Sequence, residues 1–418
     1  MTELVPLRQN RDFVLLQTGQ ALSTIGTAAS QIAYLLLVLA LTNSAAKAGI
    51  VGFSSIVPYA LFGLLAGVVA DRWNRKRVMI AMDLVRVLAM ASVVVALSLG
   101  DLTFAQLVVA SLVEGTAFVF FNIAEVGALR SVVPASQLPA AFAAEQARFS
   151  VVTLAGPPLG GVLFGIGRSL PFLADGISYA FSIVSLLWMR TPFQEVRERD
   201  TAPLRTQIRE GISFLWSHAY LRASALIFAG DNFFFQGIFL TLIVVSKGQS
   251  LSGLTIGALI AGFGAASLAG SLVAPRIARL LTIRQIMLVN QWAMALVLVY
   301  LAAPSPYVLF LSLLPVAFLS PALVSVVIGY RTAITPDHLI GRVSSVARNI
   351  ALLAQPLGPL VAGFLLAAYS GRVTVLVLGG LGVALALVST VSPSIRKPPS
   401  LDELDDLPSA AGAATMEA

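Results

Sequence analysis

The chain has 418 residues, of which 57% are hydrophobic and only 11% are charged. Soluble domains carry about 25% charged residues, so this composition excludes a soluble protein and indicates an integral membrane protein. The absence of Cys excludes disulfides and thiol nucleophiles, and only two His residues argue against a metal centre. We therefore predict no metal site, no cofactor and no catalytic residue. The net charge of +7 does not require a nucleic-acid partner, because basic residues collect in the cytoplasmic loops of membrane proteins.

Apolar windows of about 20 residues, long enough to cross a bilayer as a helix, recur along the chain. The first window is too long for the apolar core of a signal peptide, so we interpret it as a retained span. The windows predict an all-α membrane protein with about twelve transmembrane helices, at 13–41, 47–70, 78–99, 103–129, 139–166, 170–190, 220–245, 252–273, 282–303, 306–330, 343–369 and 373–393.

Basic residues gather on one side of these spans. With the 71–77 loop in the cytoplasm, most Arg residues fall in cytoplasmic loops, and the outer loops keep only Lys47, Arg168, Lys247 and Arg372. The positive-inside rule therefore places both termini in the cytoplasm, in a multi-pass protein of the cell (inner) membrane.

The longest polar interruption divides the chain into two halves. The predicted parts are a six-helix bundle at 1–190, a cytoplasmic linker at 191–219, a second six-helix bundle at 220–393 and a disordered cytoplasmic tail at 394–418. Apolar residues recur at helical spacing within the linker and predict a helix on the membrane surface, with a solvated connector helix as the alternative: Leu204, Ile208, Ile212 and Leu215.

An internal repeat relates the two halves. Residues 132–163 align without gaps on 334–365, so that Gly156 meets Gly358 and Pro157 meets Pro359. Gly and Pro in corresponding spans are typical of transporters with a substrate site between their halves.

The segment GVVADRWNRKR follows the second span. It resembles the signature loop of the major facilitator superfamily, G-x-x-x-D-R-x-x-R-[RK], at Gly67, Asp71, Arg72, Arg75 and Lys76. The resemblance implies two pseudo-symmetric six-helix bundles and a loop that gates the conformational change. A glycine there lets helices approach, and the basic residues would face lipid headgroups. A generic positive-inside loop is the alternative.

The segment GPPLGG lies in the fifth span. It resembles the end of the antiporter motif, G-P-x-x-G-G, of drug/proton exporters in the same superfamily, at Gly156, Pro157, Gly160 and Gly161. The two upstream glycines of the full motif are replaced by Ala143 and Val152. An ordinary contact of small residues between helices is the alternative reading.

Two further stretches, REGISFLWSHAYLR and PDHLIGRVSS, resemble the third drug/proton antiporter group, which includes macrolide-efflux-like and siderophore-exporter-like proteins. The resemblance extends over nearly the whole chain. Many of those relatives carry an acidic residue in the first span, where this chain has Thr27.

Ionisable residues inside the spans are costly and therefore indicate function. The predicted spans contain Asp83, Arg86, Glu114, Glu125, Glu145, Arg148, Asp175, Asp231 and Arg348. Two i,i+3 pairs are spaced for structural ion pairs: Asp83 with Arg86, and Glu145 with Arg148. Glu114 and Asp231 have no opposite charge at that spacing, so we predict that they bind the coupling proton, with helix–helix hydrogen bonds as the alternative.

Polar and aromatic residues near these carboxylates are candidates to line the substrate cavity. They are Gln20, Gln31, Asn122, Asn232 and Phe235. Aromatic and amide groups beside a carboxylate suit a bulky cationic or amphipathic compound, although aromatic residues in such helices also face lipid or core.

Together these patterns predict a monomeric, proton-coupled exporter of small molecules that works by alternating access. Its expected partners are a small-molecule substrate, the proton and membrane lipids. The alternatives are a siderophore or biosynthetic-product exporter, and an uptake permease or uniporter of the same fold. A membrane-embedded enzyme is a weaker alternative because no catalytic set of residues assembles, and no Lys follows a Gly in a P-loop pattern that would suit an ATP-driven pump.

Overall fold

The computed structural model describes residues 6–191, 193, 204–336 and 339–396, which form helices and no strand. In the first half the elements are η1 (Leu7–Gln9), α1 (Arg11–Thr42), α2 (Ala45–Arg72), α3 (Arg75–Leu99), α4 (Phe104–Val132), η2 (Ala135–Gln137), α5 (Leu138–Ile166) and α6 (Leu170–Trp188). After these come α7 (Leu204–Ser217), α8 (Ala219–Gly248), α9 (Gly253–Leu280), α10 (Ile283–Met294), η3 (Ala295–Leu301), α11 (Pro306–Ile334), α12 (Ile340–Leu353), α13 (Leu357–Ala368), α14 (Gly371–Val391) and α15 (Pro393–Arg396).

Short polar side chains begin most of the long helices, as local capping chemistry requires. Ser44, Asn74, Thr103 and Ser252 each accept a backbone N–H from three residues further on. Such caps satisfy amide groups that have no partner within the helix. These cap residues therefore fix where α2, α3, α4 and α9 start.

The described residues include twelve helical segments long and apolar enough to cross a membrane, which confirms the predicted fold class. Large apolar side chains point outward in many of them: Leu61, Leu272 and Val391 are 63%, 75% and 69% exposed. Exposed apolar surface of this extent requires an apolar solvent. The chain is a multi-pass membrane protein.

Two of the twelve segments are not continuous α-helices. The ninth changes into the 3₁₀ helix η3 after Met294, and the eleventh is interrupted at residues 354–356 between α12 and α13. Pro356 lacks a backbone N–H and disfavours helical backbone at the residue before it. In the repeat, Leu154 stands at the corresponding position of α5, which stays helical through Pro157.

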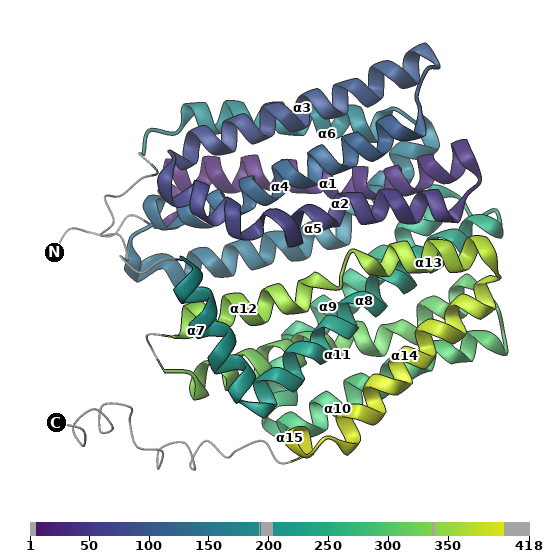
Figure 1. The fold of residues 1–418 in the computed structure, drawn as a ribbon. Helices are drawn as coiled ribbons and strands as arrows, with labels where there is room; N and C mark the ends of the chain where they lie inside the picture. The colour runs from purple at the N-terminus through teal and green to yellow at the C-terminus, as the bar shows by residue number, and fades with distance from the viewer. Residues whose placement is uncertain (1–5, 192, 194–203, 337–338, 397–418) are drawn as a thin grey trace, which may run out of the picture.

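The helices form two bundles that lie side by side (Figure 1). In the first, α1 packs against α5 and α6, and α4 lies against both α2 and α3. In the second, α8 packs against α12, α13 and α14, and α9 packs against α11. The bundles meet chiefly through α5 with α9 and α2 with α13. The boundaries predicted for the two bundles stay a prediction.

The contact between the bundles loosens along α2 toward the 71–77 loop. A Cβ placed on Gly49 would lie 2.5 Å from the carbonyl oxygen of Pro359, so the two backbones touch there. Further along, a Cβ on Gly63 would meet only Asn349 Oδ1 at 3.9 Å, and one on Gly67 would meet nothing within 4 Å. The bundles are therefore closed at one end and separated at the end that carries the 71–77 loop.

Helix α7 occupies the predicted linker and packs on α12 of the second bundle. Its contact face centres on Gly211 and Leu215, whereas Ile212 of the predicted stripe is 44% exposed. The expected membrane-surface position stays a prediction. Ile395 in α15 is buried, and α15 packs against α8 and α14. The rest of the predicted tail, 397–418, lies outside the described residues.

Gly257 tests the closed end of the interface. Its Cβ would lie 2.5 Å from the carbonyl oxygen of Pro157 in the other bundle, so Gly257→Leu is expected to lower stability by about 1–3 kcal/mol through overpacking. Thermal unfolding of the purified protein in detergent measures this. Gly380→Leu is the matched control, because a Cβ there meets nothing within 4 Å. Equal unfolding temperatures for the two variants would contradict the prediction.

Candidate functional site

A single guanidinium forms the centre of a polar network inside the first bundle. Arg86 of α3 is 1% exposed, and its Nη1 lies 3.2 Å from Asp83 Oδ1 one turn earlier. Its Nη2 donates to the hydroxyl of Thr27 on α1 at 3.0 Å and lies 4.0 Å from Glu114 Oε1 on α4. The ring of Tyr179 on α6 covers it, with 3.9 Å between the guanidinium carbon and the ring centroid. Four helices therefore converge on one buried charge.

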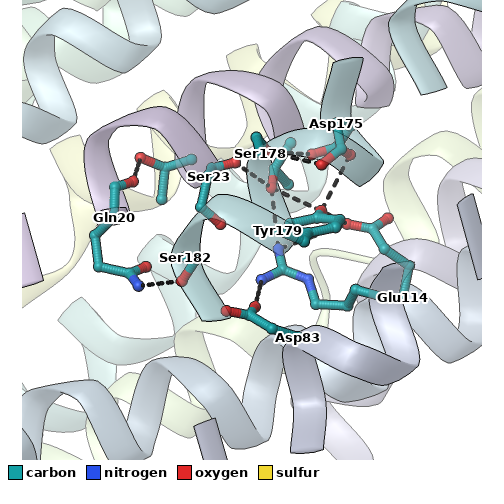
Figure 2. A network of polar contacts seen from close by, with 11 residues as sticks. Gln20, Ser23, Asp83, Glu114, Asp175, Ser178, Tyr179 and Ser182 are labelled. Carbon is teal, nitrogen blue, oxygen red and sulfur yellow. Dashed lines mark hydrogen bonds and ion pairs between the residues drawn. The ribbon is translucent and has the colours of Figure 1, made fainter. Parts of the chain in front are cut away.

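The hydroxyl of Tyr179 extends the network to a third carboxyl group (Figure 2). It lies 2.8 Å from Thr27 Oγ1, 3.0 Å from Asp175 Oδ2 and 3.3 Å from Glu114 Oε1. Ser30 donates to Asp175 Oδ2 at 2.5 Å. Asp175 and Tyr179 are one turn apart on α6, so their side chains share a face of that helix.

Glycines on α1 allow this assembly. A Cβ on Gly26 would lie 2.7 Å from Asp175 Oδ1, and one on Gly19 would lie 2.8 Å from Ser185 Oγ. The two glycines are seven residues apart and so lie on one face of α1, against α6. Their lack of side chains brings the carboxyl of Asp175 close to the backbone of α1.

The network contains one fixed positive charge and three acidic groups, all with side chains at most 5% exposed: Arg86 with Asp83, Glu114 and Asp175. Three ionised carboxylates would leave an excess of two negative charges in a low-dielectric interior, which is costly. Such a site is suited to take up a proton and to release it. The prediction singled out Glu114 but treated Asp83 and Arg86 as an isolated pair and gave Asp175 no role.

The second bundle has a related but simpler contact. Asp231 of α8 is 5% exposed, and Gln291 Nε2 of α10 donates to its Oδ1 at 3.0 Å and its Oδ2 at 2.9 Å. Among the described residues, no basic side chain forms an ion pair with it. This contact joins the first and third spans of its bundle, as Thr27 and Arg86 do in the other.

The residues predicted to line a cavity are not gathered in one place. Gln20 is buried and donates to Ser182 Oγ at 3.0 Å, between α1 and α6 of the same bundle. Asn232 donates to the carbonyl oxygen of Phe228 one turn back, and Gln31 is exposed on α1. Their expected role in substrate binding stays a prediction.

Asn122 is different, because it belongs to a chain of contacts between the two bundles. Its Oδ1 accepts from the hydroxyl of Tyr59 at 3.2 Å, and that hydroxyl accepts from Arg348 Nη2 at 3.0 Å. Phe235 is half-buried and packs edge-on against Phe234, which belongs to the core.

The basic residues of the 71–77 loop fasten it to its own bundle. Arg75 donates to the carbonyl oxygens of Ala70 and Gly127, each at 3.1 Å. Lys76 donates to the carbonyl oxygen of Met189 at 2.8 Å. These contacts tie the loop to α4 and to the end of α6.

The remaining loop residues face open space. The side chain of Asp71 is 73% exposed and 3.8 Å from Arg75, and Arg72 is also exposed. Gly67 has no neighbour that a Cβ would meet within 4 Å. The gating role of the loop stays a prediction.

The GPPLGG segment packs closely on two sides. Gly156 and Gly160 face α1, where a Cβ on either would overlap an alanine. Gly161 and Pro157 face α9 of the other bundle, where the carbonyl oxygen of Pro157 lies against Gly257. The segment therefore joins the bundles at their closed end.

The whole chain matches one family. A family model described as transmembrane secretion effector matches residues 1–415. The chain belongs to this family of the major facilitator superfamily. It is therefore a transporter rather than an enzyme. Within the described residues, no group of three or more acidic or His side chains is placed to hold a metal ion.

Relatives with assigned roles cover nearly the full length. The chain is 28% identical to the multidrug efflux pump Tap of Mycobacterium tuberculosis, over 93% of this chain and 94% of the pump. It is 24% identical to macrolide efflux protein A of Streptococcus pyogenes, over 92% and 96% of the two chains.

Solved structures share the fold at lower identity. The nucleoside transporter NupG superposes with a TM-score of 0.68 at 14% identity, over 90% of this chain and 98% of NupG. A bacterial homologue of the iron transporter ferroportin, in an inward-facing state, gives a TM-score of 0.70 at 14% identity, over 91% of this chain and all of the other.

Sequence reasoning missed Tyr179, Ser30 and the role of Asp175. The available signal was the placement of Asp175 and Tyr179 one turn apart in the sixth span. This spacing shows that the two side chains share a face of their helix. It does not identify their partners, which come from α1, α3 and α4.

Removal of the central charge tests whether the network supports the fold. Arg86→Gln leaves buried carboxylates without their cation and is expected to cost about 3–5 kcal/mol of stability. The double variant Asp83→Asn with Arg86→Gln removes one of those carboxylates and should recover part of the loss. Denaturant unfolding in detergent, followed by circular dichroism, measures both.

Arg372→Gln, which removes an exposed charge at the start of α14, is the control. If Arg86→Gln unfolds at the same denaturant concentration as this control, the network does not stabilise the bundle.

Proposed function

We propose that this transporter exports small amphipathic compounds from the cell in exchange for protons. The observation that carries the proposal is the buried network of Arg86, Asp83, Glu114 and Asp175 with the hydroxyl of Tyr179 between two of the carboxyl groups. A site with more acidic groups than positive charges, shielded from water, changes its charge by binding a proton.

The single hydrogen of the Tyr179 hydroxyl, compared with its two carboxyl contacts, supports the presence of a bound proton at this site. A phenol has one hydrogen, and an ionised carboxylate only accepts hydrogen bonds. The Tyr179 hydroxyl lies within hydrogen-bond distance of both Asp175 Oδ2 and Glu114 Oε1. Both contacts become full hydrogen bonds when one of the two carboxyl groups is protonated and donates to the phenol oxygen. We infer that Glu114 and Asp175 share a proton in this conformation.

Asp231 is the corresponding group of the second bundle. It is buried against a neutral amide, and no cation lies beside it among the described residues. Its ionised form is therefore less stabilised than the ionised carboxyl groups of the first bundle. We propose that it binds a second proton or tunes the equilibrium between conformations. The two sites lie one in each bundle, so the movement of the bundles can couple to both.

The separation of the bundles at the 71–77 end supports alternating access. The basic residues of that end support a cytoplasmic position for it, with both termini inside, in a protein of the inner membrane. The conformation is then inward-facing, as in the ferroportin homologue. Rocking of the bundles about the closely packed glycines of α5 and α9 would open the other end. A monomer encloses this pathway, and lipids surround it.

The export direction and the class of substrate rest on the relatives named as multidrug and macrolide efflux proteins. The GPPLGG segment agrees with that direction. A siderophore or a biosynthetic product is the alternative cargo, and uptake is the alternative direction.

Accumulation of macrolides and fluorescent drugs in cells that express the protein tests the proposal. We expect lower accumulation than in cells without it, loss of the difference on adding a protonophore, and loss of export in Glu114→Gln, Asp175→Asn and Asp231→Asn. Neutral side chains at these positions cannot cycle a proton. Asp101→Asn, in the exposed turn after α3, is the control and should export normally.

Each other outcome has a distinct meaning. Export that resists the protonophore would exclude proton coupling. Higher accumulation on expression would show uptake rather than export. No change for any compound would point to a narrow cargo such as a siderophore or a biosynthetic product.

A further inference from the structure

Arg348 lies on α12, inside the eleventh span, and reaches across to the other bundle. Its Nη2 donates to the hydroxyl of Tyr59 on α2 at 3.0 Å, and its guanidinium carbon lies 5.9 Å from the centroid of the Tyr59 ring. Tyr59 in turn donates to Oδ1 of Asn122 on α4 at 3.2 Å. The three side chains form one polar chain between the bundles.

The charge of Arg348 is not neutralised, unlike those of two other arginines within the spans. Arg86 lies 3.2 Å from Asp83, and Arg148 lies 2.8 Å from Glu125. Among the described residues, no carboxylate comes within ion-pair distance of Arg348, and its side chain is exposed. An unpaired charge at membrane depth is costly unless it faces water or a ligand.

Arg348 lies where the opening between the two bundles ends. On α2, Tyr59 lies between Gly52, whose Cβ would touch Pro359 at 3.1 Å, and Gly63, whose Cβ would meet only Asn349 at 3.9 Å. The bundles touch on one side of Tyr59 and separate on the other. A compound that enters from the 71–77 end therefore reaches Arg348 at the point where the path closes.

The free groups at this point are donors. A guanidinium has five N–H groups in a planar fork and no acceptor, and one of them goes to Tyr59. Asn122 uses its oxygen for Tyr59, which leaves its NH₂ group as a donor. A planar anion with two oxygens matches such a fork with two parallel hydrogen bonds.

We propose that Arg348, positioned by Tyr59 and assisted by Asn122, binds a carboxylate or an equivalent anionic group of the transported compound. The inference rests on the proposed export function and narrows it: the cargo includes amphipathic compounds that carry an acid group, and purely cationic drugs do not use this contact. Tyr59 is a positioning residue, because it holds the guanidinium through its hydroxyl and its ring.

A pair of dyes that differ at one group tests the proposal. Rhodamine 6G is an ethyl ester, and the free acid of the same dye presents a carboxylate on an otherwise identical skeleton. Fluorescence polarisation with the purified full-length protein in detergent gives both dissociation constants. We expect the native protein to bind the acid more tightly than the ester. Arg348→Gln should weaken binding of the acid by about tenfold and leave binding of the ester unchanged.

Three further variants distinguish the effect of the guanidinium geometry from the effect of its positive charge and from a loss of folding. Arg348→Lys keeps the charge without the fork and should bind the acid with intermediate affinity. Tyr59→Phe should weaken acid binding to a smaller extent. Arg222→Gln removes a half-buried arginine near the start of α8, bonded to the carbonyl oxygen of Trp216, and should leave both dyes unaffected. Unchanged ester binding shows that each variant is folded.

Equal affinity of the native protein for the two dyes, or no binding of the acid, overturns the proposal. An equal loss of binding of both dyes in Arg348→Gln also overturns the proposal. Arg348 would then have only a structural role, as a contact between the bundles. Because binding needs no proton gradient, these results are independent of the export assay. Export in cells with equal binding of acid and ester would refute this inference alone.

Discussion

The interior of the first bundle depends on the cost of a charge without a partner in a medium of low dielectric constant. Arg86 is almost fully buried in a segment that crosses the membrane, so its guanidinium must be surrounded by acceptors and negative charge. Asp83 comes from its own helix, but Thr27, Glu114 and Tyr179 come from three others. The requirement to satisfy this one group holds α1, α3, α4 and α6 in register. It also supplies the acidic groups that we propose to cycle a proton.

A second constraint is the close approach of backbones where side chains are missing. On α1, Gly19 and Gly26 admit α6, and at the closed end of the interface Gly161 and Gly257 admit the opposite bundle. Within a membrane, such contacts replace the hydrophobic driving force that packs helices in water. Gly49, Gly161 and Gly257 touch the opposite bundle at the closed end, whereas Gly67 touches nothing at the open end. Glycine therefore occurs both where the bundles touch and, at Gly67, on a surface that touches no other helix in this conformation.

The two bundles share a plan but differ in chemistry. Each joins its first and third spans by a buried polar contact, from Thr27 to Arg86 in one and from Asp231 to Gln291 in the other. The first has a fixed cation and surplus carboxyl groups, and the second has a lone carboxyl group against an amide. Protonation changes the local charge from negative toward balance in the first and from negative to neutral in the second. Under the proposed exchange of protons for substrate, the two bundles would therefore respond unequally to the same proton gradient.

The sequence by itself determined the class of protein and its gross plan. Composition and apolar windows predicted the twelve spans, because crossing a bilayer demands about 20 apolar residues whatever the neighbours are. The sequence also gave the Asp83–Arg86 pair, since residues three apart on a helix meet without help from other segments. Tertiary structure alone decided that Tyr179 covers Arg86, that Gln20 lies inside one bundle and that Arg348 reaches Tyr59 across the interface. Each of these contacts links helices far apart in the chain, and periodicity within one helix gives the face on which a side chain lies but never the partner that faces it.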